Sequence, residues 1–314
     1  MQRYILQRLV QIPILIFVIS VIVFGLIRVT PGDPVRIMMG NDSNPELERA
    51  IREELRLDQP IHVQYGEWLL GFLRGDFGKS IRTREPVVRL VAERLPVTLS
   101  LAIVAMVLAI AMALPVGIVA ASNRNSPIDY GLMFLTTVAW SVPNFVVAIL
   151  LIVVVAVNLR WLPISGTGNL FSDPLGSWRY FLMPTVALGL SRAAVMTRML
   201  RSSMLDELQR EYVRTAIAKG VGRGPMLRRH VLRNSLMPVV TVAAINFGYL
   251  LGGAVVIEQI FGLAGTGTLL VQAVFARDFP VIQAVTLMAA LAFVGVNLLA
   301  DVTYGVLDPR IRYA

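Results

Sequence analysis

The chain has 314 residues, of which 56% are hydrophobic and 16% are charged, well below the roughly 25% charged residues of soluble domains. This composition excludes a disordered chain and argues against a soluble enzyme. The lack of cysteine excludes disulfides, thiolate metal ligands and cysteine nucleophiles. A net charge of +9 can indicate nucleic-acid binding. In so apolar a chain we instead interpret the basic residues by their position relative to a membrane, and we predict no nucleic-acid partner.

Six segments are apolar enough to be predicted as transmembrane helices, each of which needs about 20 mostly apolar residues. Five contain no charged residue, namely 9–27, 97–123, 130–159, 235–257 and 279–300. Pro143 and Asn144 interrupt the third of these. The sixth segment, 181–200, is weaker because Arg192 and Arg198 lie inside it.

The distribution of basic residues decides whether the weak segment crosses the membrane. Between Arg192 and Arg233 there are ten Lys or Arg and three Asp or Glu, and cytoplasmic loops carry the excess of basic residues. The N-terminus, with Arg3 and Arg8, is predicted inside by the same rule. The basic stretch then lies inside only if 181–200 crosses. We therefore predict an all-α polytopic membrane protein with six transmembrane helices and both termini in the cytoplasm.

The long segment between the first two predicted spans is expected to form a small external helical cap. Asn44-Pro45-Glu46 is typical of a helix start, with an N-cap residue followed by proline and an acid. An apolar, aromatic stretch at 68–73 is followed by a turn at 75–78. The segment is either a purely structural cap or a docking surface or gate for a partner outside the cell.

The basic cytoplasmic segment 203–234 predicts a helix, a glycine-rich break and a second helix. The first helix is expected over 203–218, the break holds Gly220, Gly222 and Gly224, and Pro225 can start the second helix. A short helix between glycine hinges can rock as a rigid piece. A basic, solvated loop that obeys the positive-inside rule explains the same residues without a special function.

No motif for catalysis or ATP hydrolysis is found. The chain contains no Walker motif, no His-Glu-x-x-His and no Gly-x-Ser-x-Gly. The predicted spans hold few ionisable groups, whereas ion-driven carriers need carboxylates or broken helices near the midplane. The chain is therefore predicted to be a passage without catalytic residues, metal or cofactor of its own, and to take its energy from another subunit.

Short motifs along almost the whole chain carry a family resemblance. In the basic segment they are Tyr212-Val213-Arg214-Thr215-Ala216, Ala218-Lys219-Gly220, 229–234 and Pro238. Elsewhere they are 30–34, 57–60, 73–78, 93–96, 258–267 and 277–280. Together they resemble ABC importer permeases of the dipeptide, oligopeptide and nickel class, in the subunit type with a long first external loop. The chain departs from the broader signature at Arg214, where that signature has Glu, and at Arg233, where it has Pro.

The resemblance implies a type I importer fold in a bacterial or archaeal cytoplasmic membrane. It implies a second homologous permease, two ATPase subunits that bind ATP and Mg, an external solute-binding protein and a peptide substrate moved inward by alternating access. Surrounding membrane lipid is a further expected partner. The domain division that follows is 1–29 for the N-terminus and first span, 30–95 for the external cap, and 96–314 for the core permease domain.

Three groups of candidate site residues follow from the resemblance and the residue patterns. The ATPase-coupling residues, with Tyr212, Ala216 and Gly220 as the docking face, are Glu211, Tyr212, Thr215, Ala216, Lys219, Gly220, Gly222 and Gly224. The candidates for external docking or gating are Trp68, Arg74, Asp76, Phe77 and Glu258. The candidates for the translocation path are Asn144, Asn246, Gly252 and Gly253.

Two other functional classes remain open on the sequence. One is an ATP-independent secondary transporter or channel for small polar solutes, which the scarcity of charge inside the spans disfavours. The other is a membrane scaffold or insertion factor whose basic loop binds acidic lipid or the ribosome. ATP dependence separates the first from an importer, and solute flux with the complete subunit set separates the second.

Overall fold

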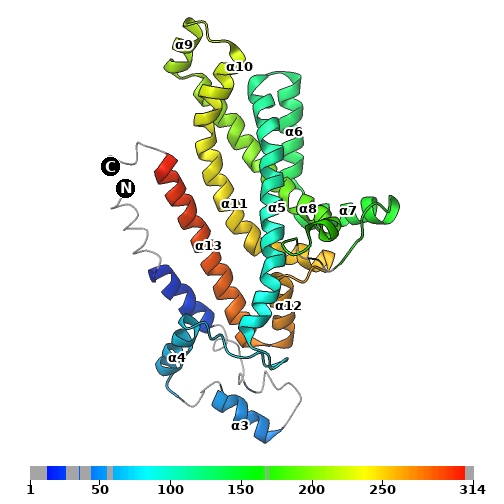
Figure 1. The fold of residues 1–314 in the computed structure, drawn as a ribbon, viewed down its shortest axis with the longest axis vertical. Helices are drawn as coiled ribbons and strands as arrows, with labels where there is room; N and C mark the ends of the chain where they lie inside the picture. Colours follow the sequence, from blue (N-terminus) through cyan, green and yellow to red (C-terminus); the bar gives the residue numbers. More distant parts are fainter. Residues whose placement is uncertain are drawn as a thin grey trace.

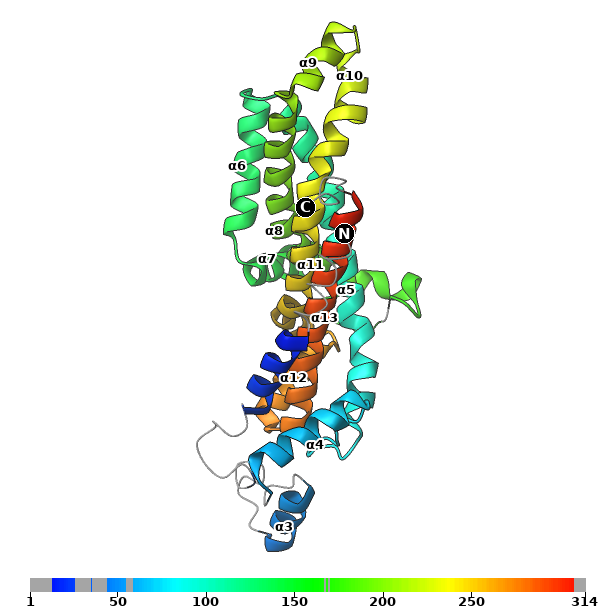
Figure 2. The same ribbon diagram turned by 90° about the vertical axis from the view of Figure 1, so that its left-hand side faces the viewer.

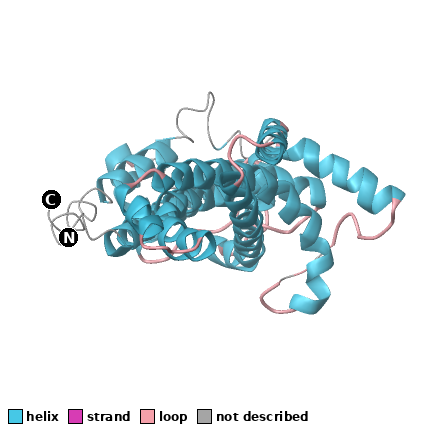
Figure 3. Ribbon diagram, turned by 90° about the horizontal axis from the view of Figure 1, so that it is seen from above, coloured by secondary structure: helices cyan, strands magenta, loops and turns pink. Residues whose placement is uncertain are grey.

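The computed structural model describes residues 13–25, 35, 44–54, 59–166, 168 and 170–307. Across these residues the regular structure is helical, apart from one isolated antiparallel bridge between Lys79 and Pro86 (Figure 3). The predicted all-α class is thus confirmed. The terminal arginines Arg3 and Arg8 and the motif at 30–34 lie outside the described residues, as do residues 57 and 58 of the motif at 57–60.

Four long helices form the body of the molecule and run along its long axis (Figure 1). They are α5 (Val87–Ser122), α8 (Pro174–Leu208), α11 (Leu232–Phe261) and α13 (Phe279–Leu307). Within the described part of the chain, these regions supply four stretches long and apolar enough to cross a membrane. The predicted spans 97–123, 181–200, 235–257 and 279–300 all fall in these helices, give or take a residue at one end. The weak segment with two arginines is therefore part of a helix long enough to span.

The third predicted span is interrupted at Pro143 and Asn144, as predicted, and the interruption is a sharp bend. It consists of α6 (Pro127–Ser141), then α7 (Asn144–Leu151) with a π-helical continuation at Ile152–Asn158, and the two parts are bent by 96° at the break. Pro143 cannot donate the backbone hydrogen bond that would continue α6, which explains the position of the bend. Figure 1 shows α7 projecting sideways from the long helices.

The predicted loop between the last two spans is also largely helical. Its residues form α12 (Thr266–Ala276), which is bent by 85° relative to the end of α11. If each bent pair forms one span, the described residues hold six candidate spans in place of four. The first predicted span is described only as the shorter helix Pro13–Gly25.

The cap is built from α3 (Pro45–Glu54) and α4 (Ile61–Leu73), and α3 begins at the predicted site, where Asn44 Oδ1 accepts a bond from Glu46 N at 3.0 Å. A series of aromatic contacts joins α4 to the first helix and to the following turn, through Phe17, Phe24, Tyr65, Trp68, Phe72 and Phe77. The predicted domain boundary between residues 95 and 96 falls inside the continuous helix α5, so the cap leads directly into the core.

Small residues let α5 and α8 pack closely at the centre of the core. Buried alanines recur along α5 at 102, 105, 109 and 113, the spacing of one helix face. A Cβ added to Gly189 of α8 would lie 3.0 Å from the Ala105 carbonyl oxygen, and one added to Gly117 would lie 2.9 Å from Leu200. Close backbone approach through small residues is typical of helix pairs in membranes.

The basic segment forms the opposite end of the molecule from the cap. It contains α9 (Glu211–Ala218), α10 (Arg223–Met226) and a π-helical turn, Leu227–Val231, that leads into α11. Figures 1 and 2 both place α9 at one end of the long axis and α3 at the other. The predicted continuous helix 203–218 is wrong, because α8 ends at Leu208 and α9 starts at Glu211.

Candidate functional site: the α9 end and the two arginines of α8

Helix α9 ends in a glycine turn that fixes its length. Gly220 has φ +78° and donates its N–H to Ile217 O at 2.9 Å, while Val221 N donates to Ala216 O at 3.1 Å. This pair of bonds is the Schellman arrangement, which favours glycine because the left-handed backbone carries no Cβ penalty there. Gly220 therefore terminates a helix, and Gly222 and Gly224 lie outside the left-handed region. Hinge motion at these glycines stays a prediction.

Tyr212 ties α9 to the helices on both sides of it. Its hydroxyl donates to Glu207 Oε2 of α8 at 2.6 Å and accepts from Asn234 Nδ2 of α11 at 3.1 Å. Burial and the hydrogen bond to Glu207 raise the pKa of the Tyr212 hydroxyl above its usual value. The group therefore stays a protonated donor at neutral pH. The hydroxyl thus links α9 to α8 and α11 at once.

The two faces of α9 differ in burial. Val213 is fully buried in the main apolar core, which anchors the inner face. The Tyr212 hydroxyl contacts α8 and α11, but the residue as a whole is exposed. Ala216 is half-buried and Gly220 is exposed, so a docking face formed by these three residues stays a prediction. The exposed residues of α9 and of the turn after it are Glu211, Tyr212, Arg214, Thr215, Ile217, Ala218, Lys219 and Gly220.

The remaining predicted coupling residues lie on this exposed surface. Glu211 pairs with Arg214 at 3.0 Å, and both side chains are mostly exposed. Thr215 Oγ1 donates back to Glu211 O at 3.0 Å, a local bond within α9. Lys219 is the exposed C-cap residue, and Gly222 and Gly224 are exposed in the connection to α10. The structure thus brings these residues together at one end of the molecule without testing their role.

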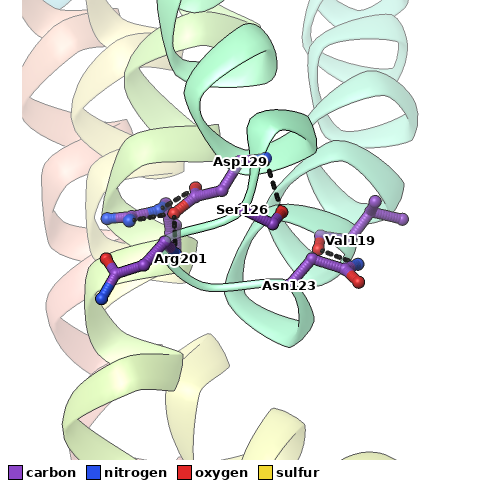
Figure 4. A network of polar contacts seen from close by, with 6 residues as sticks. Val119, Asn123, Ser126, Asp129 and Arg201 are labelled. Carbon is purple, nitrogen blue, oxygen red and sulfur yellow. Dashed lines mark hydrogen bonds and ion pairs between the residues drawn. The ribbon is translucent and has the colours of Figure 1, made fainter.

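A buried ion pair fixes the α5–α6 turn against α8 near the same end. Asp129 is fully buried and accepts two bonds from Arg201, from Nε and Nη2, each at 2.6 Å. Ser126 caps α6 by accepting from Asp129 N, and Asn125 N donates to the Asp129 carboxylate at 3.0 Å (Figure 4). Two parallel bonds between guanidinium and carboxylate give a strong and directional contact.

Arg192 of α8 has a different environment from Arg201. Its Nη1 donates to Asn246 Oδ1 at 3.3 Å, and its Cζ lies 5.8 Å from the centre of the Tyr249 ring. Both partners lie on α11. The Arg192 Nε is buried and has no hydrogen-bond partner among the described residues. Among the four residues predicted for the translocation path, Asn246 is thus the one that contacts a charged side chain inside a candidate span.

The other predicted path residues do not gather around Asn246. Gly252 is exposed on α11, and Gly253 lies next to it in the same helix. Asn144 is half-buried at the start of α7, beyond the bend in the third predicted span. Their contribution to a path stays a prediction.

At the cap end, Glu258 is fully buried and completes the start of α12. Its carboxylate accepts from Thr98 Oγ1 at 2.6 Å, from Thr268 N at 3.0 Å and from the backbone N–H of Gly267. Thr266 N donates to Thr98 Oγ1 at 2.8 Å. The first three N–H groups of α12, which have no partner inside the helix, are therefore satisfied by α5 and α11. A buried Glu258 does not present a docking surface in this conformation.

Asp278, at the turn between α12 and α13, holds the loop that precedes α5. Its carboxylate accepts from Ser80 Oγ and from Ile81 N at 3.2 Å. Ser80 and Asp278 are both buried. The cap is thereby attached to a turn almost two hundred residues further along the chain.

The four cap residues predicted for docking have mixed positions. Trp68 and Phe77 are half-buried members of the aromatic series, and Phe77 also packs on the apolar cluster of α5, α12 and α13. Arg74 is the exposed C-cap of α4. Asp76 accepts from Gly78 N at 3.0 Å and so acts as a turn residue. Arg74 and Asp76 are the two that a partner could reach.

Comparison with known proteins gives the family of this chain. Residues 113–313 match the family described as the binding-protein-dependent transport system inner membrane component, and residues 1–102 match the N-terminal region of such membrane components. The chain belongs to this family. It is therefore a permease component of a binding-protein-dependent ABC importer in the inner membrane, and not itself catalytic. It carries no cofactor, and ATPase and binding-protein partners follow from the family.

Two relatives match the permease over its whole length. A protein of Brucella abortus (strain 2308), named as a proposed peptide transport system permease, is 42% identical over 313 residues that cover all of both chains. The glutathione transport system permease protein GsiC of Salmonella choleraesuis is 40% identical with the same coverage. The crystal structure of an amino acid ABC transporter with histidines matches with a TM-score of 0.55 at 16% identity, over 69% of this chain and 93% of that chain. That likeness confirms the ABC permease fold.

Sequence reasoning missed several side chains that the structure places at junctions of the permease. They are Thr98, Asp129, Arg201, Asp278 and Ser80. The Ser126-x-x-Asp129 spacing is a capping signal that marks the start of α6 and could have identified Asp129 locally. Its partner Arg201 is 72 residues away, and no local pattern indicates that pairing.

Proposed function

We propose that the permease moves short peptides into the cell as one of two homologous membrane subunits, driven by two ATPase subunits and supplied by an external solute-binding protein. The observation that carries the substrate class is the full-length 42% identity to a relative named for peptide transport. The 40% identity to a glutathione permease extends the class to small peptide-like thiols. Both termini lie in the cytoplasm of a bacterial or archaeal cell in this proposal, and the helices lie in membrane lipid.

The exposed surface of α9 is the proposed contact with an ATPase subunit. Ile217 is 58% exposed there, although Val213 on the other side of the same helix is buried. An apolar side chain held at a fixed position on a short helix is suited to a groove in a partner. Closure of the ATPases would push α9, and the Tyr212 hydroxyl would pass the motion to α8 and α11, which switches the passage between inward-open and outward-open states.

The cap end is the proposed side for receiving the substrate. It lies at the opposite end of the long axis from α9, as a passage across a membrane requires (Figure 2). Arg74 and Asp76 are exposed there and are the proposed contacts to the binding protein. Trp68, Phe77 and Glu258 are proposed to support the cap and the start of α12, where a gate would close.

Affinity purification of the permease from its own membrane, followed by reconstitution in proteoliposomes, tests this proposal. We expect a second permease and ATPase subunits to co-purify, and expect ATP-dependent uptake of trialanine or glutathione when the binding protein is added. Recovery of the permease alone under conditions that preserve a control complex would contradict the assembly. A complete complex that transports neither compound would contradict the substrate class while leaving the importer intact.

A further inference from the structure

Two arginines of α8 have opposite surroundings although they belong to one helix. Arg201 forms a bidentate pair with the buried carboxylate of Asp129. Arg192 lies nine positions earlier, near the middle of α8, and points toward α11. At 3.6 residues per turn, the two side chains leave the helix about 180° apart. One therefore faces the α5–α6 turn and the other faces α11.

The Arg192 guanidinium has no anionic partner among the residues that the structure describes. Of its five N–H groups, one reaches the neutral amide oxygen of Asn246, and Nε is buried without an acceptor. No carboxylate of the described residues forms an ion pair with Arg192. A charged side chain inside a membrane span is costly and is retained where it faces a polar cavity or pairs with another charge. The described residues supply a charge here but no counterpart for it.

Arg192 is half-buried, and its surroundings hold it beside an exposed face of α11. Asn246 is buried and holds Nη1, while the Tyr249 ring stands beside the guanidinium. Tyr249 itself is 55% exposed. It belongs to an exposed row on α11, at the spacing of one helix face, formed by Ile245, Tyr249, Gly252 and Val256. A solute moving along this row would reach the guanidinium.

We propose that Arg192 binds the carboxylate of the transported solute during its passage, with Asn246 and Tyr249 as positioning residues. This inference rests on the proposed function in peptide import, since a free peptide carries a C-terminal carboxylate. The planar guanidinium offers two parallel N–H donors that match the two oxygens of a carboxylate. One guanidinium with few further contacts to the solute binds it weakly enough to release it on the cytoplasmic side.

The carboxylate could come from the solute or from an acidic side chain of the second permease. The two sources differ in what they predict. A solute carboxylate makes the effect of Arg192 depend on the chemistry of the peptide terminus. A carboxylate of the partner permease makes the effect independent of the peptide and weakens the association of the two permeases.

Transport of trialanine and of trialanine amide by the complete complex in proteoliposomes separates these sources. Both probes are measured with wild type, Arg192→Gln and Arg192→Lys, and the same binding protein is used throughout. Arg198→Gln is the matched control, because Arg198 lies in the same helix but stacks on Trp140 of α6 at 4.8 Å. The amount of assembled complex is measured for each variant by co-purification of its subunits.

We expect Arg192→Gln to lower trialanine uptake about tenfold or more and to leave amide uptake within about twofold, as expected for loss of a charge-assisted bond. Arg198→Gln should leave the ratio of the two uptake rates unchanged. If the wild-type complex transports trialanine but not trialanine amide, the two Arg192 variants are compared with trialanine alone. Arg192→Lys must then retain more trialanine uptake than Arg192→Gln. Equal loss for both probes, equal loss in both Arg192 variants, or no change in uptake would overturn the proposal. Wild-type complex that transports neither probe refutes peptide import itself.

Discussion

The two ends of the permease are held together by different chemistry. At the cap end, the buried carboxylates of Glu258 and Asp278 accept bonds from hydroxyls and backbone N–H groups of segments far away in the sequence. At the α9 end, the Tyr212 hydroxyl and the buried Val213 attach a short helix whose outer surface stays open. At the cap end, these bonds fix the start of α12 and the loop that precedes α5. The α9 end is fixed on one side only, which suits a part that receives a force from a partner.

The largest expected effect concerns the buried pair that supports the α9 end. Asp129→Leu leaves Arg201 without its anion, and removal of one partner of a buried pair costs about 3–5 kcal/mol. We expect a large drop in the midpoint of thermal unfolding in detergent. The double variant Asp129→Leu/Arg201→Met removes both charges and should recover most of that loss. A double variant no more stable than Asp129→Leu would contradict the pairing as the cause.

The next effect tests how tightly the cap end is packed. A Cβ at position 267 would lie 2.7 Å from the Val255 backbone Cα and 2.8 Å from Glu258 Oε2, and backbone atoms cannot move aside cheaply. We expect Gly267→Ala to destabilise by about 1–3 kcal/mol. Gly252→Ala, in open space on the same helix pair, is the matched control and should be near neutral. Equal thermal midpoints for the two variants would show that the start of α12 is not constrained by Glu258.

A smaller effect should follow from loosening the attachment of the cap. Asp278→Ala removes the acceptor for Ser80 Oγ and Ile81 N, and an unsatisfied buried donor costs about 1–3 kcal/mol. Limited proteolysis should cut the 80–84 loop faster in this variant. The double variant Ser80→Ala/Asp278→Ala should be little worse than Asp278→Ala alone. Unchanged cleavage in Asp278→Ala would contradict its role as the tie.

The smallest effect on stability, and the most informative one for transport, is expected at Tyr212. Tyr212→Phe removes the bonds to Glu207 and Asn234 at a cost of about 1 kcal/mol, since the ring stays in place. If the hydroxyl passes motion from α9 to α8 and α11, peptide-stimulated ATP hydrolysis should continue while uptake per ATP falls. Tyr130→Phe, an exposed tyrosine of α6, is the control. If uptake per ATP is unchanged in Tyr212→Phe, the Tyr212 hydroxyl does not couple α9 to transport.

Much of the secondary structure of this protein could be predicted from short stretches of its sequence. Runs of uncharged apolar residues predicted the long helices α5, α11 and α13, because a membrane span must be mostly apolar. The span in α8 contains Arg192 and Arg198 and was predicted from the distribution of basic residues along the chain. Asn44 marked the start of α3, and Gly220 stands where α9 terminates, because caps are decided within a few residues. Pro143 marked the interruption in the third span, although a proline fixes the place of a bend and not its angle of 96°.

Only the tertiary structure decided which side chains meet. Thr98 and Glu258 are 160 residues apart, Ser80 and Asp278 are 198 apart, and Asp129 and Arg201 are 72 apart. No periodicity relates such positions, because their partners are chosen by how whole helices pack. The same cause explains why Tyr212, predicted as a docking residue from spacing along α9, turns toward α8 and α11. It also explains why two arginines of the same helix α8 differ. Packing brings a carboxylate to Arg201, whereas it brings the amide of Asn246 and the ring of Tyr249 to Arg192.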